Sequence, residues 1–340
     1  MEMTQSAGLA HPVADVQASR PRTEVSLTRV GVRGIEKVIR VGGHRTREDG
    51  ADAPGNYFFA DIECFVDLNP RQAGVHMSRF EEIVGEAIDS VVLGESLRAE
   101  ELAAHIATRI REQQQGLRAE VTVAARYPET VRTPASELPT QEIYTLLGTA
   151  VVSERGTRTL TGVETQGMTA CPCAQELVAG RSRERLTEEG FTDDEIERVF
   201  ASVPVATHNQ RGIGSLHIGL GEDLQLEVDA RDLLHIVEQS MSSEIYELMK
   251  RSDEAEVVEK AHRRPRFVED CVREMLRMAV EEFAPLGEDT FLSARQRNLE
   301  TIHQHDVVAE RHGLIGDLAR ELAGGEPGPR ITPRQWLAGA

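Results

Sequence analysis

The chain has 340 residues, of which 57 are acidic and 38 are lysine or arginine, so its net charge is −19. This length can bury a substantial core, as one large domain or two medium ones. A field of this sign repels nucleic acid and anionic lipid, which excludes a general nucleic-acid or membrane-surface binder. No apolar stretch approaches the roughly eighteen residues of a membrane helix, and the polar N-terminus does not resemble a secretory signal, so we expect a cytoplasmic protein.

The basic residues are unusual in kind, because only three of them are lysines. Excess acid with few lysines is typical of proteins adapted to high salt, where self-repulsion is screened. We therefore expect a halophilic protein, with GC-rich codon usage as the alternative cause.

The cysteines indicate the redox compartment. Four occur: Cys64, Cys171, Cys173 and Cys271. Cys171 and Cys173 are one residue apart, a spacing poorly suited to a mutual disulfide. A reducing cytoplasm is expected, in which a cysteine serves as a thiolate or a metal ligand.

The first half of the chain alternates between strand and helix patterns. Residues 1–24 are expected to be a loose tail and 44–55 a charged loop. The predicted elements are strands at 26–42 and 57–68, a helical stretch at 78–114, and strands at 117–127 and 143–153. The helical stretch has a predicted break near Gly94-Glu95-Ser96, where Ser96 is a potential helix cap.

The second half repeats much of this order. The predicted elements are strands at 157–168 and 213–229, helices at 231–250 and 265–283, and a strand at 291–303. An extra segment at 174–203 carries a short predicted helix that begins at Thr192, with Glu195 completing a capping box. We expect an α+β chain of two similar units, 25–155 and 156–310, followed by a C-terminal tail at 311–340.

A Cys-Pro-Cys motif is the sharpest local signal. Cys171 and Cys173 follow a predicted strand, where a thiolate can bind a metal or attack an electrophile. No second Cys or His pair stands at matched spacing, so a structural zinc site is not expected. The competing interpretation is a pair of small core residues.

Two polar clusters follow. Thr207 to Arg211 contains His208, a potential ligand, and Arg211, a potential phosphate contact, although such a run also suits a solvated loop. Lys250 and Arg251 form a basic pair in an acidic chain, which suits a polyphosphate or, by itself more plausibly, a helix C-terminus.

A His-x-His pair completes the candidates. In a strand, His303 and His305 would share one face beside Asp306, as a metal site or an acid–base relay requires, although surface histidines are frequent. A mixed set of cysteine, histidine and carboxylate suits a catalytic Zn²⁺ or Fe²⁺ that activates water.

Six segments span residues 76–305 in a fixed order. They are His76-Met77-Ser78-Arg79-Phe80, Cys171-Pro172-Cys173, His208-Asn209-Gln210-Arg211, Glu244-Ile245-Tyr246 with Lys250 to Glu254, Phe267-Val268-Glu269-Asp270, and Ile302-His303-Gln304-His305. Together they resemble the metal-dependent GTP cyclohydrolases of the bacterial IB type and their archaeal relatives. All six in order make chance agreement implausible.

The resemblance implies a fold and an assembly. The fold is the tunnelling fold, with two tandem ββααββ-like units whose antiparallel sheets form a barrel in the oligomer. Active sites then lie at subunit interfaces of a homodimer or homotetramer. The two-unit organisation predicted from the pattern agrees with this.

The resemblance also implies roles for individual residues. The metal ligands would be Cys171, His208, Glu254 and His303, with Cys173 as the alternative to Cys171. Glu269 would hold the guanine edge, and His305 or His208 would move protons. The residues implied to face the phosphates are His76, Ser78, Arg79, Arg211, Lys250 and Arg251.

The implied reaction is the first step of pterin biosynthesis. Water activated by the metal attacks C8 of GTP, the imidazole ring opens and formate leaves. The insertion between Cys173 and His208 and the acidic composition resemble the archaeal form, which is associated with Fe²⁺ (Zn²⁺ or Mn²⁺ as substitutes) and with 7,8-dihydroneopterin 2′,3′-cyclic phosphate.

Three alternatives stay open. They are the linear dihydroneopterin triphosphate of the bacterial form, a nitrile reductase of the same fold, and a non-catalytic metal-binding protein. The consuming pathway, whether folate, a methanopterin-like cofactor or a modified tRNA base, is also open.

Overall fold

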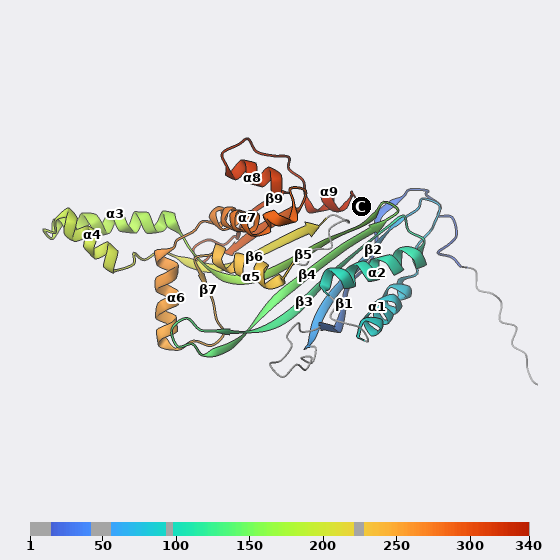
Figure 1. Cartoon of the computed structure of the whole chain (residues 1–340), viewed down its shortest axis with the longest axis horizontal. Coiled ribbons are helices and arrows are strands. Elements are labelled where there is room, and N and C mark those ends of the chain that lie inside the picture. Colours follow the sequence, from blue (N-terminus) through green and yellow to red (C-terminus); the bar gives the residue numbers. More distant parts are fainter. Residues whose placement is uncertain (1–14, 42–55, 93–97, 221–227, 340) are drawn as a thin grey trace, which may run out of the picture.

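A computed structural model describes residues 15–41, 56–92, 98–220 and 228–339 (Figure 1). The strands are β1 (Leu27–Val41), β2 (Asn56–Leu68), β3 (Arg118–Arg132), β4 (Pro139–Ser153), β5 (Gly156–Ala170), β6 (Asn209–Leu220), β7 (Ser243–Glu244), β8 (Phe291–Leu299) and β9 (Val307–Leu314). The helices are α1 (Met77–Val92), α2 (Ala99–Gln114), α3 (Pro172–Glu188), α4 (Asp193–Ser202), α5 (Ala230–Ser240), α6 (Arg251–Arg263), α7 (Val268–Phe283), α8 (Ile315–Leu322) and α9 (Pro333–Leu337), with a 3₁₀ turn at Ala284–Leu286. The loop predicted at 44–55 and the break at Gly94-Glu95-Ser96 lie outside the described residues, as does most of the tail predicted at 1–24.

The strands form one antiparallel sheet. Its order is β1-β2-β3-β4-β5-β6-β8-β9, and β7 pairs with β5 off this path. Buried residues alternate along β3, as expected of a strand with one covered face. The order strand, strand, helix, helix, strand, strand predicted for the first half is confirmed, and the chain is a mixed α+β protein.

Both helix pairs cover the same face of this sheet. Val123, Gly148, Thr161 and Ile218 are successive partners across β3, β4, β5 and β6, so their side chains share one face. Val123 belongs to the core under α1 and α2, whereas Ile218 belongs to the core under α5 and α7. A Cβ at Gly148 would lie 2.2 Å from the α2 backbone, so only glycine allows this close approach.

Helix α9 packs on the opposite face. Trp336 of α9 is 5% exposed and stacks on Phe291 with ring centroids 5.4 Å apart. A Cβ at Gly219 would lie 2.7 Å from the Trp336 ring, which therefore rests against β6. The prediction of a tail at 311–340 is wrong, because this segment contains the end of β9, α8 and α9. One buried aromatic in a Gly- and Pro-rich segment gives no periodic signal.

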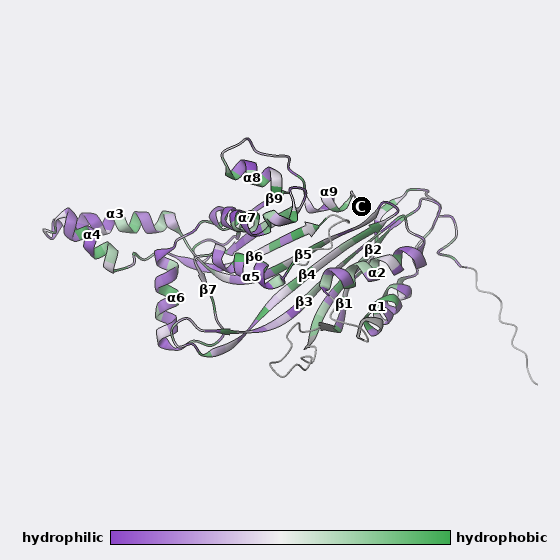
Figure 2. Ribbon diagram, in the orientation of Figure 1, coloured by the Kyte–Doolittle hydropathy of each residue, from purple (hydrophilic) through white to green (hydrophobic). Residues whose placement is uncertain are grey.

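The insertion after β5 is a helical hairpin that projects from the body (Figure 1). The predicted helix at Thr192, with its capping box to Glu195, is confirmed as α4. The longer α3 was not predicted, because it has no buried residue and hence no apolar stripe. Hydrophilic residues predominate along both helices (Figure 2).

Several boundaries differ from the sequence prediction; for example, the strand predicted at 213–229 begins at Asn209 and ends at Leu220. The helix expected at 231–250 ends at Ser240, because the next residues pair with β5 as β7. The strand expected at 291–303 ends at Leu299. Lys250 precedes the start of α6 instead of ending a helix, and its N–H donates to the Asp253 carboxylate at 2.8 Å. Of the helices in the described ranges, none has the length and apolar character needed to cross a membrane.

Candidate active site

The candidate site lies where β5 ends and β6 begins. The Cys171 N–H donates to the His208 carbonyl at 3.1 Å, and the Thr207 hydroxyl donates to the Cys171 carbonyl at 2.7 Å. Cys171 also caps α3, where its Sγ accepts the Ala174 N–H at 3.5 Å. Pairing of β5 with β6 thus brings Cys171 and His208 together, although they are 37 positions apart in the sequence.

Glu300 lies beside His208 although it was not predicted as a site residue. Its Oε2 is 3.8 Å from His208 Nδ1, and the two side chains are 7% and 14% exposed. The same Nδ1 lies 3.0 Å from the Gln210 amide oxygen. The feature of the sequence that could have identified Glu300 is its Glu-x-x-His spacing to His303, immediately after β8.

The start of α7 borders the same strand end. The Arg266 N–H donates to the Ala170 carbonyl at 2.9 Å, one residue before Cys171. Glu269 stands in the first turn of α7 and is exposed. The carboxylate expected to recognise guanine is therefore near the Cys171 end of β5.

The histidine pair follows β8. His303 and His305 lie in an exposed bend, not in the predicted strand, and their rings stack with centroids 5.2 Å apart. Across the described ranges, no three His, Cys, Asp or Glu side chains are close enough to hold one metal ion. Within the described residues of a single chain, Cys171 and His208 therefore meet through their backbones, Glu300 meets the His208 side chain, and the four predicted ligands are not assembled.

Glu254 lies at the far end of α6. At one end of this helix, the Ser136 N–H of the β3–β4 turn donates to the Asp253 carboxylate, with a donor–acceptor distance of 2.7 Å. At the other end, His262 Nε2 is 3.3 Å from the carbonyl of Thr207. The eight residues from 254 to 262 correspond to about 12 Å of helix. Lys250 and Arg251 share the end with Glu254, away from Cys171 and His208.

The first predicted phosphate segment lies at the opposite end of the molecule, at α1 (Figure 1). A pocket of about 430 Å³ includes His76 and Arg79 in its lining. His76 Nε2 is 3.2 Å from Asp15 Oδ2, and the Arg79 guanidinium donates to the Gln113 carbonyl at 3.3 Å. Ser78 is exposed nearby. One chain therefore cannot place this segment beside Cys171.

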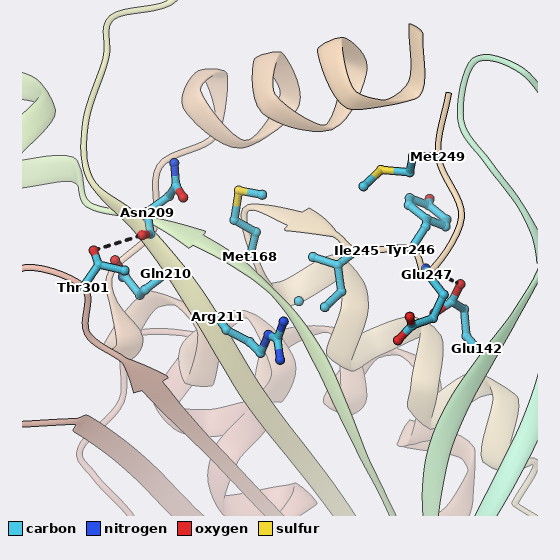
Figure 3. Close-up of a pocket in the computed structure, with 11 residues that line it drawn as sticks. Glu142, Met168, Asn209, Gln210, Arg211, Ile245, Tyr246, Glu247, Met249 and Thr301 are labelled. Atoms are coloured by element: carbon cyan, nitrogen blue, oxygen red, sulfur yellow. Dashed lines mark hydrogen bonds between the residues drawn. The ribbon is translucent and has the colours of Figure 1, made fainter. Parts of the chain in front are cut away.

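A second pocket is lined in part by Asn209, the residue after His208 (Figure 3). It measures about 440 Å³. Its lining residues are Glu142, Gly167, Met168, Asn209, Gln210, Arg211, Ile245, Tyr246, Glu247, Met249 and Thr301. Arg211 lies in this pocket, as expected of a substrate contact, and the Thr301 hydroxyl donates to the Asn209 carbonyl at 3.1 Å. The pocket joins two of the segments that carry the family resemblance.

A largely buried carboxylate, Glu238, lies on α5 and contacts Tyr144 of β4. Burial raises the pKa of Glu238 to about 7, and the negative charges of Glu244, Glu129 and Glu142 add to this, against a 2.9 Å hydrogen bond donated by the Tyr144 hydroxyl. Between its ordinary pKa near 4.5 and about 7, the folded state holds a proton that the unfolded state has released. Stability from this group is therefore present below pH 4.5 and lost as pH rises through 7.

Glu238→Gln is expected to remove this loss. A neutral amide still accepts from Tyr144, so the variant should match the unsubstituted protein at pH 5 and exceed its unfolding free energy by about 2 kcal/mol at pH 8. Urea unfolding at the two pH values measures the difference. An equal effect at both would show that ionisation of Glu238 is not the cause.

Comparison with known proteins decides the family. The sequence matches the family described as Type I GTP cyclohydrolase folE2 over residues 13–309. The chain belongs to this family. It is 41% identical to GTP cyclohydrolase MptA of Methanococcus aeolicus, over 91% of this chain and 99% of that protein. It is 38% identical to GTP cyclohydrolase MptA of Methanocaldococcus jannaschii, over 91% of this chain and 97% of that protein.

Among solved structures, uricase from Arthrobacter globiformis aligns with a TM-score of 0.48 and 8% identity, over 84% of this chain and 93% of that chain. These values are too low to establish a shared fold. Family membership therefore rests on the sequence relatives, which match nearly their whole length.

Proposed function

We propose that this protein is a GTP cyclohydrolase of pterin biosynthesis. It uses water to open the guanine imidazole ring at C8 and releases formate, diphosphate and 7,8-dihydroneopterin 2′,3′-cyclic phosphate. Membership of the family and the relatives named GTP cyclohydrolase MptA support the activity. The observation that carries it is the position of His208 where β5 ends and β6 begins, with its backbone paired to Cys171 and its side chain beside Glu300.

We propose that these three residues contribute ligands to the catalytic metal, Fe²⁺ by preference. Thiol, imidazole and carboxylate are the donors that catalytic metal sites combine, so the residues fit the ion in kind. Cys171, His208 and His303 keep their proposed roles, whereas Glu300 supplies the carboxylate in place of Glu254, because Glu300 is beside His208. These residues would hold the ion, which would supply the acidity needed to activate water.

The remaining roles belong to the protein's own side chains. Glu269 accepts hydrogen bonds from the N–H groups of the guanine edge, near the end of β5. Arg211 contacts the substrate from the 440 Å³ pocket. His305, stacked on His303, moves protons near neutral pH.

We propose that the complete site needs a second copy of the chain. His76, Ser78 and Arg79 lie at the far end of the molecule from Cys171, so they reach the phosphates of GTP only across a subunit interface. A homodimer or homotetramer in which the sheets close into a barrel, as in the tunnelling fold, provides such an interface.

An anaerobic assay with GTP and Fe²⁺ at high salt tests the function. We expect formate release together with a pterin whose mass is that of the cyclic phosphate. A triphosphate product would assign the protein to the bacterial reaction. Absence of formate with Fe²⁺, Mn²⁺ and Zn²⁺, from folded protein, would favour the non-catalytic metal-binding alternative.

A further inference from the structure

A chain of buried polar contacts runs behind His208. His208 immediately precedes β6 and Gln210 is the second residue of that strand, and their side chains point to the same side, so the imidazole and the amide meet. His208 Nδ1 is 3.0 Å from Gln210 Oε1, and Gln210 Nε2 donates to the Thr169 hydroxyl at 3.0 Å. Thr169 is the direct β5 partner of Gln210, so strand register fixes the second contact.

Because these contacts are buried, they select one tautomer of the His208 imidazole. Gln210 is 5% exposed and Thr169 is fully buried, so water does not compete for their polar atoms. The NH₂ group of the Gln210 amide faces Thr169, and the carbonyl oxygen of the same amide faces the imidazole. That oxygen only accepts, so it selects the tautomer with a proton on Nδ1. The lone pair of Nε2 is then free to bind a ligand.

We propose that Gln210 is a positioning residue for His208, and that Thr169 orients the Gln210 amide. This role rests on the proposed metal site, because it prepares the His208 imidazole to bind a cation through Nε2. Partners of this kind orient ligand histidines and raise their basicity, and their loss typically lowers metal affinity about 10–100-fold.

Co²⁺ titration of the metal-free full-length protein tests the proposal without turnover. The dissociation constant from chelator competition and the visible Co²⁺ absorption bands are measured for Gln210→Leu, Gln210→Glu and Thr169→Val. Gln210→Leu should weaken Co²⁺ binding by about 10–100-fold and shift the bands. Gln210→Glu keeps an acceptor for Nδ1–H and should restore the affinity, whereas Thr169→Val should cause a smaller loss.

Gln296→Leu is the matched control, because it also buries leucine in place of a glutamine on this sheet, at a residue on β8 that does not contact His208. It should alter the melting temperature without changing Co²⁺ affinity. Unchanged affinity and bands in Gln210→Leu, with binding abolished in His208→Ala, would overturn the positioning role alone. Unchanged binding in His208→Ala would overturn the metal site and the positioning role together.

Discussion

Glu300→Gln should lower the rate of formate release from GTP by at least about a thousandfold, equivalent to roughly 4 kcal/mol of barrier. The amide removes the negative charge beside His208 but keeps the size of the side chain. The Glu300 carboxylate is almost buried, and its Oε2 lies 3.8 Å from His208 Nδ1. Among the described residues, no other acidic side chain forms an ion pair with that imidazole. Formate release and bound iron, measured on the same protein, report both consequences.

Two further carboxylates make this result specific. Glu259 lies on α6, pairs with Arg263 at 2.7 Å and is half exposed, so Glu259→Gln should keep both rate and iron content. Glu254→Gln distinguishes the two candidate ligands, and we expect it to retain bound iron. Loss of iron in Glu254→Gln with full iron in Glu300→Gln would reverse our assignment of the carboxylate.

Trp336→Ala should lower the free energy of unfolding by about 3–5 kcal/mol. The indole fills the space between Phe291 and Gly219, and the Arg158 guanidinium donates to the Trp336 carbonyl at 2.7 Å. Truncation leaves a cavity at the sheet face and removes the aromatic contact. Trp336→Phe should recover a large part of the loss, because an aromatic ring can still stack on Phe291.

Urea unfolding of the purified variants measures this loss. Trp336 is the only tryptophan, so its fluorescence also reports on the docking of α9. A blue-shifted emission in the folded protein should move to the red in the same transition that unfolds the sheet. A loss below about 1 kcal/mol for Trp336→Ala, or a red-shifted emission before unfolding, would show that α9 is detached in solution.

Periodicity predicted the parts of the fold that bury a regular face. The strands at Leu27–Val41 and Asn56–Leu68 and the helices on either side of 93–97 follow from alternating or helical apolar patterns. The helix α3 and the segment from Ile315 to Leu337 could not be predicted in this way. The first buries nothing, and the second depends on contacts with residues more than a hundred positions earlier, such as Arg158.

The site was predictable in its residue types but less in its arrangement. The motifs of Cys171 and His208 were found because cysteine and histidine are rare and chemically distinctive. Glu300 was missed because acidic residues are abundant in this chain, with 57 in total, and only the fold selects one. Glu254 was predicted as a ligand from the family resemblance. In the structure, α6 places it about two turns of helix from His262, which lies beside Thr207.

Anomalous diffraction at the iron edge, from crystals of the Fe²⁺-loaded oligomer, tests the central claim most directly. We predict one strong peak per chain where β5 ends and β6 begins, within bonding distance of Cys171 Sγ, His208 Nε2 and a Glu300 oxygen. A peak at the start of α6 beside Glu254 and away from these three atoms, or no ordered iron in an active protein, would contradict it.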